Sequence, residues 1–297
     1  MNSPSRISSY RCVLVLCLLA SAVPAGAKDP CASPDRILTS GPYTIRVREA
    51  APKNGAGMVR VSRNGRVLVT LRERFIEEAK ILPLLGPDSA DLVVKTFSGG
   101  LHWSYVIYIV QLGPRLRPLL TFDARNYGTI DFRDLDHDGR QELIAWDDTF
   151  AYYDYSFAAS PALPFVFRYE HGRYRDVTAR FRWLVKENQE KAKRKLLKAK
   201  REYLAARRRA GKQEMSDKAY WDLESRDSLI HSAVVWVYGD GLLLGRSKQT
   251  ERWLRANLPR QDWCWFRSRR RDIRRTLLAR DRKLSYRLRK PPRYTPY

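Results

Sequence analysis

The sequence predicts an α+β fold, in which an antiparallel β-rich part precedes a basic helical part. Short stretches of β-branched and aromatic residues, separated by turn residues, run from Tyr43 to about Thr178. After Phe181 the composition changes to Lys, Arg, Glu, Ala and Leu, which favour helices. We therefore expect a β-rich domain over residues 28–181, a basic helical domain over 182–286 and a disordered tail over 287–297.

The N-terminus has the pattern of a cleavable secretory signal. Arg6 and Arg11 precede an apolar run over residues 13–20, and Ala25-Gly26-Ala27 supplies an A-x-A cleavage site. The run is shorter than the roughly 20 apolar residues that cross a bilayer. We expect residues 1–27 to be a signal peptide, and the mature protein to be periplasmic or secreted without a transmembrane span.

Removal of the signal peptide leaves two cysteines, Cys31 and Cys264. In an oxidising compartment two cysteines can form one disulfide, which here would join the mature N-terminus to the C-terminal region. Chain-entropy arguments give such a long loop a few kcal/mol of stabilisation. The alternative is two unpaired thiols, and we predict the disulfide.

The β-rich part contains several strand signals in succession. Tyr43–Glu49 alternates apolar and polar residues, as a half-buried strand does, and Asn64-Gly65 favours a tight hairpin turn between two apolar runs. Further strands are expected over residues 91–97, 104–111, 165–169 and 174–177. A closed propeller requires at least about four blades of roughly 40–45 residues each. The β-rich part is too short for that, so we expect blade-like units or a sandwich.

The most specific chemical signal is the loop D-L-D-H-D-G-R-Q-E at residues 134–142. Calcium takes about six to eight oxygen ligands, and aspartates at alternate positions can supply several of them from one loop. Gly139, in the sixth place, permits the tight turn around an ion. The alternative is an acidic turn without an ion, because Asp and Gly both favour turns. Four carboxylates this close would repel one another, so we predict a bound cation.

The spacing of this loop also decides its type. An EF-hand needs a glutamate in the twelfth position and flanking helices, whereas here that position is Ala145 and the flanks, 129–132 and 143–146, have strand character. A D-x-D-x-D-G-x-x-E loop between two strands resembles the calcium loop of FG-GAP/VCBS-type repeats in integrin-like β-propellers, over roughly residues 90–180. The resemblance implies that the Ca²⁺ ligands are the side chains of Asp134, Asp136, Asp138 and Glu142 and the backbone carbonyl of Arg140.

The C-terminal part is helical in pattern and strongly basic. Helices are expected over residues 183–210, from Ser216 to a break at Gly239-Asp240-Gly241, over 247–257, and from Asp262 onward. Residues 182–297 hold 33 Lys and Arg against 13 Asp and Glu, which accounts for most of the net charge of +24. An exported basic surface meets anionic lipid head groups or acidic polymers, and no physiological nucleic acid is expected. The alternative is a set of solvated, arginine-rich helix faces without a partner.

These features predict a non-enzymatic exported protein, in which a calcium-stabilised β domain carries a polybasic helical module that interacts with the cell envelope. The competing hypothesis is a hydrolase that acts on an envelope polymer or glycan with acidic residues near the ion. Asp147 and Asp148 are adjacent, so on a strand they point to opposite faces and make a poor acid–base pair. Asp131, Asp134 and Asp154 are the other acidic candidates. The oligomeric state does not follow from the sequence.

Overall fold

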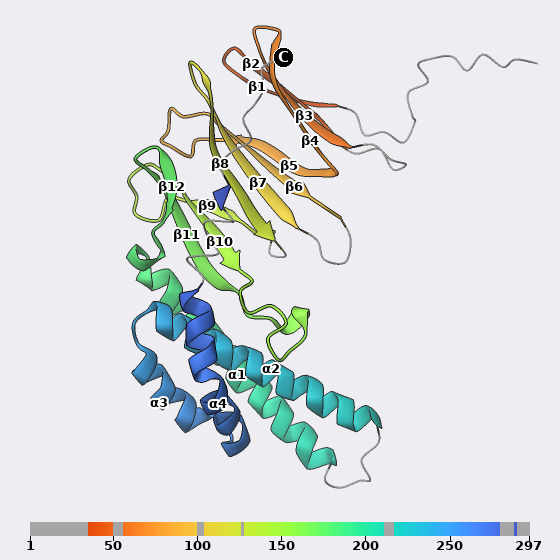
Figure 1. The fold of residues 1–297 in the computed structure, drawn as a ribbon, viewed down its shortest axis with the longest axis vertical. Coiled ribbons are helices and arrows are strands. Elements are labelled where there is room, and N and C mark those ends of the chain that lie inside the picture. Colours follow the sequence, from red (N-terminus) through yellow and green to blue (C-terminus); the bar gives the residue numbers. More distant parts are fainter. Residues whose placement is uncertain are drawn as a thin grey trace, which may run out of the picture.

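The computed structural model describes residues 35–49, 56–99, 104–125, 128–210, 217–279 and 288–289. Over these residues the chain forms three antiparallel sheets followed by four α-helices, and none of the sheets closes into a barrel (Figure 1). The prediction of an α+β fold without a closed propeller is confirmed. The predicted signal peptide and Cys31 lie outside the described residues, so the cleavage site and the disulfide stay predictions. Cys264 is exposed on the last helix.

The first sheet is a four-stranded meander in the order β1-β2-β3-β4. Its strands are β1 (Arg36–Ser40), β2 (Tyr43–Arg48), β3 (Gly57–Arg63) and β4 (Arg66–Glu73). The predicted hairpin turn joins β3 to β4, and Asn64 and Gly65 both adopt positive φ angles, 49° and 80°. In β2, Tyr43, Ile45 and Val47 are buried and the residues between them are exposed, as the alternation predicted.

The middle sheet has the order β13-β8-β7-β6-β5 and is buried on both faces. Its strands are β5 (Phe75–Leu82), β6 (Asp91–Phe97), β7 (Tyr105–Leu112), β8 (Leu116–Arg125) and β13 (Leu288–Arg289). Leu92 and Val94 of β6 pack into the core shared with the first sheet, whereas Val93 packs into a second core on the opposite face. Burial on both faces explains the continuous apolar runs in these strands.

The third sheet, in the order β12-β11-β10-β9, joins the β part to the helices. Its strands are β9 (Asp131–Arg133), β10 (Glu142–Asp147), β11 (Leu163–Glu170) and β12 (Arg173–Asp176). Leu143 and Phe165 pack into the core shared with the middle sheet, while Ile144 and Val166 pack on the other face against Leu184 of the first helix. The three sheets are therefore stacked in chain order, the start of α1 packs on the outer face of the third, and the helices continue beyond the end of that sheet (Figure 1).

The helices lie where the sequence predicted them, with one important difference. They are α1 (Arg182–Ala210), α2 (Asp217–Leu243), α3 (Ser247–Asn257) and α4 (Arg260–Leu278). Their common core includes Ala192, Leu196, Ile230, Val234 and Phe266. Within the described part of the chain, no helix combines the length and the apolar content that a membrane crossing requires.

The difference concerns Gly239-Asp240-Gly241, where a break was expected and the helix α2 continues instead. A Cβ atom on Gly241 would lie 2.3 Å from Thr250 Oγ1 of α3, and one on Gly239 would lie 3.0 Å from Leu163 Cδ1 of β11. The glycines thus allow neighbouring elements to approach α2 closely, and this packing offsets the cost of about 1 kcal/mol that glycine imposes on a helix. Asp240 is buried and its Oδ2 accepts a hydrogen bond of 2.9 Å from Asn188 Nδ2.

The connection between β10 and β11 belongs structurally to the helical part. It contains the short 3-10 helix η1 (Phe157–Ala159), and Phe150 and Tyr155 are buried in the helical core. The hydroxyl of Tyr153 donates a hydrogen bond of 2.8 Å to Asp272 Oδ2 on α4. The two parts of the chain therefore share a core at their junction.

The C-terminal segment returns to the β part. Leu288 pairs with Phe122 and Arg289 with Thr121, so β13 extends the middle sheet beside β8. Both residues fall in the tail that was predicted to be disordered, and they form a strand instead. The other residues of that tail lie outside the described residues.

Substitution of Gly241 by alanine tests the role assigned to the glycines of α2. In an exposed helix interior, glycine to alanine raises the free energy of unfolding by about 1 kcal/mol. Here the new methyl group would collide with Thr250, so we expect the free energy of unfolding to fall by about 1–3 kcal/mol, as in other overpacked sites. Urea denaturation measures the loss. The double variant Gly241→Ala/Thr250→Ala should recover part of it, and a more stable single variant would contradict the packing argument.

Candidate metal centre in the acidic loop

The loop between β9 and β10 is folded by its own aspartates. Asp134 accepts hydrogen bonds from the backbone N–H groups of Asp138, at 3.1 Å, and Gly139, at 2.9 Å. Asp138 in turn accepts a bond of 3.0 Å from the N–H of Arg140. His137 and Gly139 have positive φ angles of 59° and 85°, which is why glycine suits the sixth position. The carboxylate of Asp134 therefore stabilises the turn through hydrogen bonds to its backbone.

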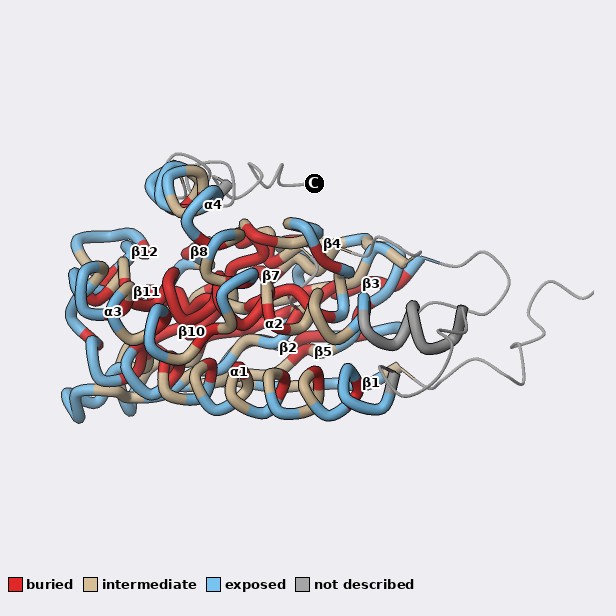
Figure 2. Tube along the Cα trace, turned by 90° about the horizontal axis from the view of Figure 1, so that it is seen from below, coloured by how far each residue is buried: buried red, intermediate tan, exposed pale blue. Residues whose placement is uncertain are grey.

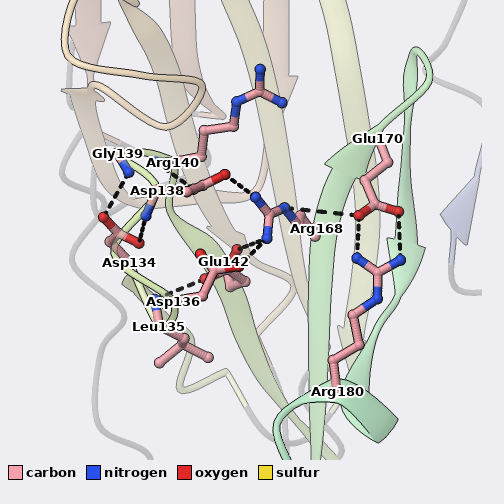
Figure 3. Close-up of polar contacts among 10 residues, drawn as sticks. All are labelled: Asp134, Leu135, Asp136, Asp138, Gly139, Arg140, Glu142, Arg168, Glu170 and Arg180. Atoms are coloured by element: carbon pink, nitrogen blue, oxygen red, sulfur yellow. Dashed lines mark hydrogen bonds and ion pairs between the residues drawn. The ribbon is translucent and has the colours of Figure 1, made fainter.

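This turn brings the predicted ligands together. The carboxylate oxygens of Asp134, Asp136 and Asp138 lie within 4.8 Å of one another. Glu142, the first residue of β10, is fully buried, and its Oε2 accepts a hydrogen bond of 2.8 Å from the N–H of Leu135. Its other oxygen, Oε1, is buried without a hydrogen-bond partner. The Arg140 side chain extends away from these carboxylates (Figure 3), so only its carbonyl is available as a ligand.

Arg168 of β11 is the residue that the sequence did not reveal. Its guanidinium forms ion pairs with Asp136 and Asp138, and its Nη1 lies 3.6 Å from Glu142 Oε1 (Figure 3). Its side chain is only 12% exposed. Residues alternate between the two faces of a strand, so Arg168 shares a face with Val166, the face that packs against the helices. In the sequence, Arg168 stands out only as an arginine within an aromatic strand. Its contact with the acidic loop depends on how β11 pairs with β10, which the sequence does not show.

The ion pairs continue from the loop across the third sheet. Arg168 Nε lies 3.8 Å from Glu170 Oε1, and Glu170 Oε2 accepts a hydrogen bond of 3.3 Å from Arg180 Nη2. Arg180 belongs to the 3-10 helix η2 (Thr178–Arg180), which directly precedes α1. A row of alternating charges therefore links the acidic loop to the start of the helices (Figure 3).

The protonation equilibria show an excess of negative charge at this site. Burial raises the pKa of Glu142; the Leu135 N–H and Arg168 counteract this, and the charges of Asp136 and Asp138 add to it. Burial alone would lower the pKa of Arg168, but its acidic neighbours raise it. Three carboxylates of the loop, Asp136, Asp138 and Glu142, pair with one guanidinium, so further positive charge would stabilise the site.

The donor set fits a hard divalent cation. All the side-chain donors are carboxylate oxygens, which calcium prefers, and the buried Oε1 of Glu142 accepts no hydrogen bond. Arg168 already contacts one oxygen of Asp136 and one of Asp138, so a cation bound by the loop would compete with the guanidinium for the charge of these carboxylates. The arginine and the cation are thus competitors for the same ligands.

The acidic residues considered for hydrolysis each have a separate partner. Asp147 Oδ1 accepts hydrogen bonds from the N–H and Oγ1 of Thr149, at 3.0 and 2.8 Å. The remaining pairs are Asp148 with Arg125 at 3.6 Å, Asp131 with Arg133 at 2.8 Å and Asp154 with Arg269 at 2.9 Å. A cavity of about 360 Å³ lies between η2 and the ends of α2 and α4, and its lining includes none of these aspartates. The structure does not assemble them into an acid–base pair.

Substitution of Arg168 by glutamine tests its role without added metal. The change leaves the buried Glu142 beside two aspartates without their cationic partner. In the presence of chelator we expect the free energy of unfolding to fall by about 1–3 kcal/mol. This is below the loss for a fully buried pair, because Asp136 and Asp138 are 40% and 38% exposed and water screens them. Urea denaturation measures the difference.

The matched control is Arg133→Gln, which breaks an exposed ion pair with Asp131 within β9 of the same sheet. Exposed ion pairs contribute little to stability, so the free energy of unfolding of this variant should be close to that of the unsubstituted protein. Equal losses in the two variants would contradict the special role of Arg168.

Comparison of the chain with protein-family models, with curated proteins and with solved structures gives no match. At residues 134–142 the structure shows an acidic hairpin in which three aspartates converge and two of them form ion pairs with an arginine.

Proposed function

We propose that the protein is a non-enzymatic exported protein, in which a calcium-stabilised β domain carries a basic helical module that binds anionic surfaces of the cell envelope. The observation that supports this best is the closure of the acidic loop. Its carboxylates hold a hairpin and contact Arg168, which is 12% exposed, and they do not line the cavities of about 360 and 320 Å³ elsewhere in the molecule. Such a site suits a structural ion better than a substrate.

Calcium would act on the fold at one place, the β9–β10 hairpin. Asp134, Asp136, Asp138 and Glu142 would supply side-chain oxygens, and Arg140 its carbonyl. A carboxylate oxygen has two lone pairs, so the oxygens of Asp134 can bind an ion while they accept backbone hydrogen bonds. The ion would then hold together two neighbouring strands of the sheet on which the helices pack.

The basic module would act through one face of α1. Lys191, Arg194, Lys198, Arg201 and Arg208 are exposed and follow one another at helical spacing, while Ala192 and Leu196 face the core. In Figure 2, exposed residues recur in the successive turns of α1 along its length. A row of exposed cations attracts anionic lipids and acidic polymers, each residue near such a surface contributing about 1 kcal/mol.

The competing hydrolase hypothesis has less support. It requires acidic residues that converge on a cleft, whereas Asp131, Asp148 and Asp154 each form an ion pair with a different arginine. The loop aspartates that do converge contact a guanidinium.

Calcium should stabilise the folded protein by mass action. For a dissociation constant of about 0.1–1 mM, typical of extracellular modules, 10 mM calcium would add about 1.4–2.7 kcal/mol and raise the melting temperature. Asp136→Asn should lose this response, whereas Asp131→Asn, just outside the loop, should keep it. Arg168→Gln should respond at lower calcium concentrations, because the competing cation is absent. Identical melts in calcium and in chelator would exclude the proposed ion.

Binding to anionic vesicles tests the basic module. The full chain should sediment with phosphatidylglycerol vesicles at low salt, dissociate from them at high salt, and ignore phosphatidylcholine vesicles. Replacement of Lys191, Arg194, Lys198 and Arg201 by glutamine should weaken binding by several orders of magnitude. The control removes the same charge from the β part, through glutamine at Arg66 and Arg72 of β4, Arg74 just after it and Arg115 in the β7–β8 turn, all exposed. Equal effects of the two sets would show that net charge, rather than α1, determines binding.

A further inference from the structure

A second group of potential ligands lies in the helical part, away from the acidic loop. Asp227 and His231 are one turn apart on α2, and Asp262 belongs to the first turn of α4. Residues four apart on a helix share a face, so the first two side chains point together toward α4. His231 Nε2 lies 3.7 Å from Asp227 Oδ2 and 3.6 Å from Asp262 Oδ1. The ligand atoms of the three residues all lie within 4.8 Å of one another.

These separations fit a shared ion better than direct hydrogen bonds. Hydrogen bonds between nitrogen and oxygen are about 2.7–3.2 Å long, shorter than either distance here. Two ligands of a tetrahedral ion with bonds of about 2.1 Å lie about 3.4 Å apart. The distance from the imidazole nitrogen to each carboxylate is therefore close to the distance between two ligands of one metal ion.

The two carboxylates of this group lie close enough to hydrogen-bond each other, which requires a proton or a cation between them, and each has one oxygen without a partner. Asp262 is only 1% exposed and its Oδ2 has no hydrogen-bond partner. Asp227 Oδ1 is likewise buried without one. A buried carboxylate without a partner costs several kcal/mol, so such a group needs a cation or a proton.

The imidazole is held in position by α4. His231 stacks on Trp265, with the ring centres 3.8 Å apart and the planes within 6° of parallel. Trp265 stands one turn after Asp262 on the same helix, so one element supplies both a carboxylate and the support for the ring. Fixed orientation of a ligand by its surroundings is typical of metal sites, because it removes the entropy cost of ordering the ligand when the ion binds.

We propose that Asp227, His231 and Asp262 bind a divalent transition-metal ion of the zinc class. Imidazole nitrogen favours such ions over calcium and magnesium, which prefer oxygen ligands. The two carboxylates and a neutral imidazole balance the charge of a divalent ion. The side chains of Asp227 and His231 are 34% and 14% exposed, so water reaches the outer side of the site and completes the coordination shell. Three protein ligands with a water position form an open site rather than a closed structural one.

Zinc titration of the untagged full chain by isothermal calorimetry tests this site. Excess calcium keeps the acidic loop occupied, and we expect one zinc ion per chain. His231→Gln and Asp227→Asn should each weaken zinc binding by more than about 100-fold, because even residues that only support a ligand contribute about 10–100-fold. Both positions are partly exposed, so both variants should fold, and circular dichroism checks this. Asp262→Asn should show the same loss if it folds.

The controls are His171→Gln, an exposed histidine in the turn between β11 and β12, and Asp136→Asn in the acidic loop. Neither should change the zinc affinity. Absence of zinc binding by the unsubstituted chain, or an affinity that His231→Gln and Asp227→Asn leave unchanged, would overturn the proposal. In that case the three side chains form a buried network that is satisfied by shared protons.

Discussion

Burial of both faces of the third sheet is the interaction on which the rest of the structure depends. One face of this sheet covers the middle sheet through Leu143 and Phe165, and the other covers the start of α1 through Ile144 and Val166. A sheet with two apolar faces needs a layer on each side, and the chain supplies a sheet for one and helices for the other. The stack of sheets therefore ends at the helices, where a propeller would continue with another blade.

The acidic loop lies at the polar edge of that same face. Glu142 and Arg168 share it with Ile144 and Val166, so the charged cluster continues a surface that is otherwise apolar. Charge in such a place must be neutralised by a partner from the chain or from solution. In this structure the partner from the chain is Arg168, which contacts Asp136 and Asp138.

Local signals could be predicted from the sequence, and contacts between distant elements could not. The alternation in β2, the Asn64-Gly65 turn and the positions of α1 and α3 depend on residues that are neighbours in the chain. Asp134, Asp136 and Asp138, the predicted ligands, belong to one short motif, and their carboxylates lie within 4.8 Å of one another. Arg168 was missed because only strand pairing brings it to the loop. The predicted helix break at Gly241 was wrong because this glycine serves to let Thr250, from another helix, pack closely against α2. Asp262 joins Asp227 and His231 for the same reason.

The return of the chain to β8 gives the helices two attachments to the β part. The helical part follows the third sheet at η2, and after it the chain pairs with the middle sheet at β13. The helices are therefore an insertion between two segments of the β part rather than a domain attached at one end. The middle sheet contains strands from early in the sequence together with one from its end. During synthesis this sheet cannot be completed until almost the whole chain is available, which makes the order of folding differ from the order of the sequence.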